Sequence, residues 1–160
     1  MKKTRIYLDT SVISHLDAPE TPEKMEDTLR LWGKIQAGAY DVVLSRVVFD
    51  ELNRCQEPKK SYLTASIQEI KYERVEPNDD TETLANKFVE LGILKEKSFD
   101  DCLHIAAALM SRCDVIVSWN FKHIVNLKTI KGAKIVAVTG GYEDIMICSP
   151  TMLIEEADNE

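Results

Sequence analysis

Short apolar runs alternate with longer stretches of helical periodicity, and this alternation constrains the fold of the chain more than any other feature. Strands that are apolar on both faces are typical of parallel sheets covered by helices on either side. We therefore expect a three-layer α/β sandwich with a central, mainly parallel sheet of 4–5 strands. The predicted strands are Ile6–Leu8, Val42–Leu44, Val115–Val117 and Ile135–Val138, with a weaker one at Lys71–Val75.

The segments between these runs carry apolar residues at helical spacing. Leu84, Phe88 and Leu91 form one such stripe, and Gly92 follows as a helix stop. The segment Cys102–Met110 is apolar nearly all round, so it is expected to be the most buried helix. A chain of 160 residues without repeats or a linker favours one domain over 1–160, whose acidic tail at 155–160 is expected to fray.

Charge, cysteine spacing and hydropathy exclude several classes of protein. The net charge of −7 argues against a general nucleic-acid coat protein, although an enzyme with a local basic patch remains compatible with it. The four cysteines include no CxxC pair, so zinc and redox motifs are absent and buried free thiols are expected. Every apolar run is far shorter than the roughly 18 residues of a membrane span. The cationic start lacks an apolar segment typical of secretion signals, so we expect a cytoplasmic protein with no membrane partner.

Three carboxylates are predicted to meet at one edge of the sheet. Asp9 directly follows the first apolar run, Glu51 lies in the first turns of the helix after the second, and Asp101 opens the helix before the strand at 115–117. Ligands of open α/β sheets bind beyond the carboxyl ends of the strands, and a helix that leads into a parallel strand begins at that same edge. Asn120, which follows the strand at 115–117, is brought there by the same rule.

Acids gathered without a strong basic partner form a site for a hard divalent cation. Burying carboxylates among apolar groups costs free energy unless a cation or hydrogen bonds compensate, which favours a built site. Structural interpretations stay open beside this one. Asp9 or Thr10 could cap a short helix, Glu51 could be a solvated helix acid, and Ser98-x-x-Asp101 is similar to a capping box.

Four segments resemble the PIN-domain family, which includes the VapC-type toxins of toxin–antitoxin pairs. The matching segments, in a resemblance that covers roughly residues 5–140, are Tyr7–Ile13, Ser45–Leu52, Asp101–Ala108 and Asp114–Asn120. The resemblance implies a nuclease fold whose acids bind Mg²⁺ or Mn²⁺, with single-stranded RNA as the usual substrate. Asp9, Glu51 and Asp101 match the family's acids by position. An antitoxin protein and a homodimer are further expectations from the resemblance.

The sequence departs from the family pattern at one acidic position, which falls at Asn120. An amide oxygen can ligate a hard cation but brings no negative charge, so occupancy by two metal ions is in question. Asp100 is a candidate for an additional metal ligand, and Ser118 for a partner of a metal-bound water. His104, three residues after Asp101, is expected to be a packed core histidine rather than a residue that supports a metal ligand.

Two functions of different classes fit these features. The first is a metal-dependent ribonuclease that hydrolyses phosphodiester bonds of single-stranded RNA through a metal-bound water. The alternative, motivated by Asn120 and the acidic net charge, is a catalytically weakened PIN-like module that binds nucleic acid or protein. A phosphatase with Asp9 as the nucleophile is disfavoured because Ser11 stands where a DxD motif needs an acid. No GxGxxG or P-loop follows any predicted strand, which argues against a nucleotide-binding Rossmann domain.

Overall fold

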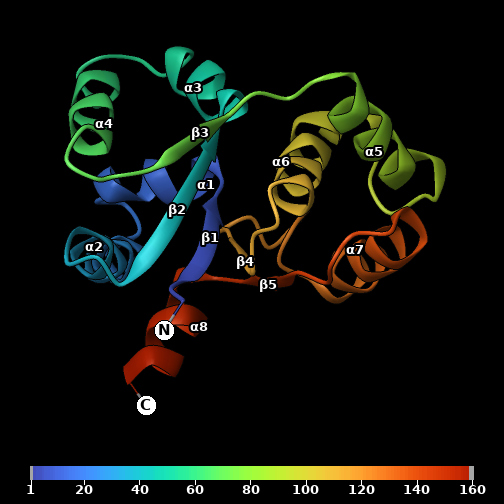
Figure 1. Cartoon of the computed structure of the whole chain (residues 1–160). Helices are drawn as coiled ribbons and strands as arrows, with labels where there is room; N and C mark the ends of the chain where they lie inside the picture. Colours follow the sequence, from blue (N-terminus) through green and yellow to red (C-terminus); the bar gives the residue numbers. More distant parts are fainter. Residues whose placement is uncertain (1, 159–160) are drawn as a thin grey trace.

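The computed structural model describes residues 2–158 and contains one sheet in which every neighbouring pair of strands is parallel (Figure 1). The strand order is β3-β2-β1-β4-β5. This confirms the expected α/β architecture. The strands are β1 (Thr4–Leu8), β2 (Tyr40–Ser45), β3 (Glu73–Val75), β4 (Val115–Val117) and β5 (Met146–Cys148).

Helices cover both faces of the sheet, and the sheet divides the core into two halves (Figure 1). In β1, Tyr7 packs into one half of the core, whereas Ile6 and Leu8 pack into the other. The helices on the Tyr7 face are α5 (Asp79–Glu90), α6 (Phe99–Met110) and α7 (Leu127–Gly140). The opposite face carries α1 (Thr10–Ser14), the 3₁₀ helix η1 (His15–Asp17), α2 (Pro22–Gln36), α3 (Arg46–Asn53), α4 (Lys59–Ile67) and α8 (Pro150–Asp158). A second 3₁₀ helix, η2 (Glu96–Ser98), precedes α6.

The predicted strand at Ile135–Val138 is wrong, because these residues lie inside α7. Val136 and Ala137 are buried while Ile135 and Val138 are exposed, which is the pattern of one helical turn. The Asn126 side chain accepts a hydrogen bond from the backbone of Thr129 and so caps the helix start. The run at 135–138, rich in β-branched residues, has the composition of a strand but forms part of a helix. The last strand of the sheet is instead β5, which contains only three residues.

Two other predictions concern helices. The segment Cys102–Met110 lies within α6, whose residues from Cys102 to Leu109 are buried except Leu103, as expected. Residues 155–158 continue α8, and the expected fraying of the acidic tail stays a prediction. The Asp158 carboxylate there pairs with Arg30 at 2.7 Å and Lys34 at 2.9 Å. Residues 159–160 lie outside the described part of the chain.

Among the helices described, none has both the length and the apolar character needed to span a membrane.

Candidate active site

The centre of the sheet contains a topological switch point between β1 and β4. From β1 the chain proceeds outward through β2 and β3 on one side, and β4 and β5 lie on the other. Leu8 and Val117 are paired in register, so the two strands end side by side, and the Asp9 amide donates to the Val117 carbonyl at 3.3 Å. Adjacent strands whose connections lead in opposite directions leave a crevice at their carboxyl ends, where open α/β sheets bind ligands.

Asp9 lies at this switch point and is almost fully buried, with 3% of its surface exposed. One carboxylate oxygen accepts a hydrogen bond from the Ser11 hydroxyl at 2.6 Å, and the other from the Ser118 hydroxyl at 2.5 Å. The same carboxylate accepts from the Val12 amide, so Asp9 also caps α1, as one interpretation of the sequence held. Burial raises the pKa of Asp9, while the charge of His104 and these hydrogen bonds act in the opposite direction.

Glu51 projects from α3 toward α6, where it meets His104. The His104 Nε2 and Glu51 Oε1 atoms lie 2.6 Å apart, and the Thr10 hydroxyl donates to the same oxygen at 2.7 Å. The other ring nitrogen of His104 shares a 2.6 Å hydrogen bond with the Tyr7 hydroxyl, which in turn contacts Ser45 at 2.7 Å. A continuous chain of polar groups therefore passes through the core beneath the carboxyl edge.

The pKa shifts of this pair favour the charged form of both Glu51 and His104. Burial alone would raise the pKa of Glu51, but the hydrogen bond and charge of His104 bring it below its usual value. Burial alone would lower the pKa of His104, yet the bond to Glu51 and the charges of Asp9, Glu51 and Asp101 raise it. His104 is buried, as expected of a core histidine, with 2% of its surface exposed. Its contact with Glu51 also makes it part of the acid cluster, so His104 supports a predicted metal ligand as well as packing in the core.

Asp101 lies in the first turn of α6 and faces Asn120. The Asn120 side-chain amide is 3.4 Å from an Asp101 oxygen, and the Asn120 backbone amide donates to the Ser118 hydroxyl at 2.9 Å. Burial raises the pKa of Asp101 to about 6, with His104 opposing the shift and Asp9 adding to it. Ser98 precedes α6 but makes no capping hydrogen bond through its side chain, so the capping-box interpretation is not supported.

Asp100, the additional ligand candidate, is oriented differently from Asp101. Its carboxylate lies 3.6 Å from the Arg54 guanidinium and is half exposed. No hydrogen bond joins it to the other acids within residues 2–158. Asp100 therefore pairs with Arg54, whereas Asp101 faces Asn120.

The three acids share one electrostatic environment that contains little positive charge. Among residues 2–158, no lysine or arginine forms an ion pair with any of them, and His104 is paired with Glu51, while the charges of Arg54 and His123 lower the pKa of Glu51 and Asp101 respectively. In this conformation, no three His, Cys, Asp or Glu side chains in that range have their ligand atoms gathered around one point. Hydroxyl groups and His104 occupy the carboxylate oxygens instead. Hard oxygen donors, burial and raised pKa values nevertheless fit a divalent cation, which would remove the mutual repulsion.

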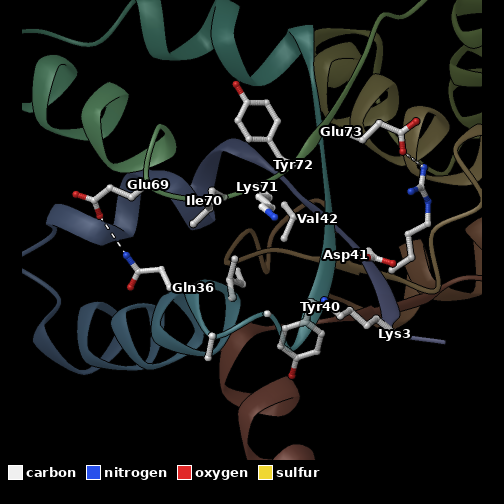
Figure 2. Close-up of a pocket in the computed structure, with 14 residues that line it drawn as sticks. Lys3, Gln36, Tyr40, Asp41, Val42, Glu69, Ile70, Lys71, Tyr72 and Glu73 are labelled. Atoms are coloured by element: carbon white, nitrogen blue, oxygen red, sulfur yellow. Dashed lines mark hydrogen bonds and ion pairs between the residues drawn. The ribbon is translucent and has the colours of Figure 1, made fainter. Parts of the chain in front are cut away.

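The basic residues near the N-terminus lie at the opposite edge of the sheet, where the strands begin. A cavity of about 580 Å³ lies at this amino edge, between the end of α2 and the starts of β2 and β3. Figure 2 shows the side chains that line it. Lys3, Asp41, Lys71 and Glu73 contribute charges of both signs to its lining. None of the three clustered acids lines this cavity. We therefore place the candidate site at the carboxyl edge, where buried charge needs compensation, rather than in this cavity.

The comparisons with known proteins agree with the architecture. A family model described as PIN domain matches residues 6–122, which include Asp9, Glu51, Asp101 and Asn120. The crystal structure of VapBC2 from Rickettsia felis, bound to a DNA fragment from their promoter, has a similar fold with a TM-score of 0.53 at 12% sequence identity. That similarity covers 91% of this chain and 98% of the other. No curated protein matches the chain.

Proposed function

This chain belongs to the PIN-domain family of nucleases, and we propose that it is a Mg²⁺- or Mn²⁺-dependent endoribonuclease that hydrolyses single-stranded RNA. One observation carries the proposal. Asp9, Glu51 and Asp101 lie at the carboxyl edge of the sheet, close enough for their charges to act on one another, and none of them forms an ion pair with a lysine or arginine of residues 2–158. The one cationic partner, His104, pairs with Glu51, and a cluster of three carboxylates with a single imidazole is suited to a divalent cation supplied from solution.

Asp9, Glu51 and Asp101 are the residues that would hold the metal ion, with the Asn120 amide oxygen as a neutral fourth donor. A bound divalent ion lowers the pKa of a water molecule and offsets charge at the attacked phosphate. The protein's own groups orient the acids. Ser11 and Ser118 hold the two oxygens of Asp9, and His104 with Thr10 holds one oxygen of Glu51, leaving its other oxygen available. Such outer hydrogen bonds fix the direction in which a ligand presents its lone pairs.

Asp101 is the acid best suited to move a proton. Its pKa of about 6 in the absence of metal shows that its ionised form is held at a cost. A carboxylate with a pKa near the working pH can accept a proton from an attacking water and release it afterwards. Asn120 and Ser118 connect Asp101 to Asp9 through hydrogen bonds. These bonds fix the position of Asp101, the proposed proton acceptor, relative to Asp9, the most deeply buried of the three acids.

The partner of this site is proposed to be an antitoxin protein that covers the carboxyl edge, with the chain itself forming a homodimer in the cytoplasm. The fold likeness to a VapBC2 complex supports this toxin role. Coexpression with the protein encoded beside it should yield a complex in which RNA cleavage is suppressed. Sedimentation analysis of the isolated chain tests the dimer.

A second function is favoured by Asn120, which stands at an acidic position of the family. A binding module with a weakened site would retain the fold yet hold no metal. Titration calorimetry with Mn²⁺ separates the two functions, because the nuclease requires binding that is lost in Asp9→Asn. If Mn²⁺ binds equally to both proteins, or to neither, the proposed metal centre is wrong.

The nuclease proposal is tested by incubating purified protein with a labelled single-stranded RNA and Mn²⁺ or Mg²⁺. We expect cleavage that EDTA stops and that Asp9→Asn reduces by about 10²- to 10⁴-fold. Asp114→Asn is the matched control, since Asp114 lies at the amino edge and accepts a hydrogen bond from the Arg5 amide that asparagine can also accept. Cleavage by Asp9→Asn at the rate of the parent would refute the assignment.

A further inference from the structure

An exposed aromatic side chain stands beside the acid cluster. Trp119, Asn120 and Phe121 follow β4 directly, and Phe121 retains 47% of its surface exposed whereas Trp119 retains 7%. The two aromatic rings meet edge to face, with 6.2 Å between their centroids. Leaving a phenylalanine in water forgoes the free energy of burying its ring, so its position next to a functional edge calls for an explanation.

The segment that presents Phe121 is fixed at several points. The Trp119 indole donates to the Thr28 hydroxyl in α2 at 2.8 Å, and its backbone amide donates to the Ser11 hydroxyl at the same distance. The Asn126 side chain donates to the Phe121 carbonyl at 3.0 Å. The exposure of Phe121 is therefore a property of an ordered turn with many hydrogen bonds, and a side chain presented in this way loses little entropy on binding.

The same contacts tie the aromatic pair to the acids. Ser11, which holds the Trp119 backbone, also donates to Asp9. Asn120, the residue between the two aromatic rings in the sequence, contacts Asp101. Phe121 is therefore joined to Asp101 through its chain neighbour Asn120, and to Asp9 through Trp119 and Ser11.

A cation accompanies the two rings. The Lys24 ammonium, from the first turn of α2, lies 5.4 Å from the Phe121 centroid and 5.6 Å from that of Trp119. Within residues 2–158, no acid forms an ion pair with Lys24. The chain has a net charge of −7, so a lysine without an acidic partner is notable. Lys24 lies beside exposed aromatic surface and is suited to bind a phosphate group of RNA.

We propose that Phe121, supported by Trp119 and flanked by Lys24, is a base-stacking subsite for a nucleotide adjacent to the cleaved phosphodiester. Every nucleobase has a flat π-face, so a phenylalanine ring binds single-stranded RNA with little sequence preference. Lys24 would contact the phosphate of the stacked nucleotide. The inference rests on the proposed nuclease function and names the part of the surface that holds the RNA strand.

The test measures KM and kcat for cleavage of a short single-stranded RNA with Mn²⁺, together with RNA binding by fluorescence anisotropy in EDTA. Stacking of one base corresponds to about 5- to 100-fold in affinity, so Phe121→Ala should raise KM and the dissociation constant by that factor and leave kcat nearly unchanged. Phe121→Trp should retain both values. Tyr72→Ala, which removes a partly exposed aromatic ring from the amino edge, is the matched control and should change neither.

Two further measurements separate stacking from a general loss of affinity. RNA carrying an abasic site at the stacked position should bind parent and Phe121→Ala equally, because the base that the ring contacts is missing. Lys24→Gln should weaken binding and reduce the salt dependence by about one charge, whereas Lys2→Gln, at the opposite edge, should not. Circular dichroism confirms that each variant is folded.

The outcomes distinguish the inference from the function beneath it. If the parent cleaves RNA and Phe121→Ala does so with an unchanged KM, the stacking subsite is wrong and the nuclease stands. If the parent binds RNA through Phe121 but never cleaves it, the subsite stands and the nuclease fails. A parent that neither binds nor cleaves RNA overturns both. If Phe121→Ala leaves RNA binding intact but weakens self-association, the ring belongs to a protein interface and the inference is overturned.

Discussion

Acidic residues at the two edges of the sheet differ in burial and in the partners that offset their charge. At the amino edge, the Arg5 guanidinium pairs with Glu73 at 2.5 Å, and the Arg5 backbone amide holds Asp114 at 2.8 Å. At the carboxyl edge, Asp9 and Asp101 are more deeply buried yet have no ion pair with a lysine or arginine of residues 2–158. Arg5 thus pairs with an acid that is largely exposed to solvent. Asp9 and Asp101, whose ionisation costs more free energy because they are buried, have no lysine or arginine partner within residues 2–158.

This contrast separates structural acids from functional ones. An acid that serves only the fold gains by acquiring a partner within the chain. Burial, with a smaller contribution from the charges of Asp9 and Glu51, raises the pKa of Asp101, and this arrangement lowers the stability of the metal-free protein at neutral pH. Such a cost is characteristic of sites prepared for a ligand. Four predictions test whether the contrast between the edges is real, beginning with the largest expected effect.

Removing the ring nitrogens of His104 should weaken the metal centre most. In His104→Phe, Glu51 loses the partner that orients it and the Tyr7 hydroxyl loses one contact. Because outer hydrogen bonds of metal ligands contribute about 10- to 100-fold, Mn²⁺ affinity by calorimetry should fall by that factor. Tyr7→Phe, which leaves the His104–Glu51 contact in place, should have a smaller effect. Equal Mn²⁺ affinity in His104→Phe and the parent would show that His104 serves only the core.

Asp101→Asn should stabilise the protein in EDTA at neutral pH. The folded-state pKa of about 6 exceeds the ordinary value of 3.8, so ionisation costs free energy in the folded state and stability falls as pH rises through that window. At 1.4 kcal/mol per pKa unit, and allowing for partial exposure, the gain at pH 7.5 is about 1–2 kcal/mol.

Thermal unfolding measures this gain as an increase in Tm of about 2–8 °C. The difference should vanish below about pH 3, where the carboxyl group is protonated in both states. Added Mn²⁺ should narrow it by stabilising the parent more than the variant. A variant less stable than the parent at every pH would mean that Asp101 is a structural residue.

Substitutions of opposite charge at Asn120 should shift metal binding in opposite directions. Asn120→Asp restores the family's acidic position, so Mn²⁺ affinity should increase by up to about tenfold, which corresponds to the roughly 1 kcal/mol of one added charge near the surface. Asn120→Lys places a cation beside Asp101, so it should weaken Mn²⁺ binding and raise Tm in EDTA. Shifts of the same sign in both variants would point to lost Asn120 hydrogen bonds rather than to charge.

The smallest effect is expected at the amino edge. Arg5→Gln removes the ion pair with Glu73, and surface pairs of this kind contribute less than about 1 kcal/mol to the free energy of unfolding. Urea denaturation should show a small loss of stability, while Mn²⁺ affinity and RNA cleavage stay as in the parent. A change in Mn²⁺ affinity would mean that the two edges are coupled, which would weaken the contrast between them.

Sequence by itself determined the parallel sheet and the edge at which the acids meet. Apolar runs at 6–8, 42–44 and 115–117 identify strands buried on both faces, and the direction of parallel strands then fixes where Asp9, Glu51 and Asp101 must lie. The error at 135–138 has the same origin, because a short β-branched run does not reveal whether its period is two or 3.6. Length and the capping Asn126 were the available signals for a helix.

Only the tertiary structure decided which polar side chains support the acids and which acid is excluded. Tyr7 sits inside an apolar strand, and its buried hydroxyl had to find a partner, but nothing local identifies that partner as His104, 97 positions away. Asp100 and Asp101 are neighbours in sequence, yet a rotation of about 100° per helical residue directs one toward Arg54 and the other toward Asn120. Hydrogen bonds across the core depend on packing between elements, which the order of residues along the chain does not specify.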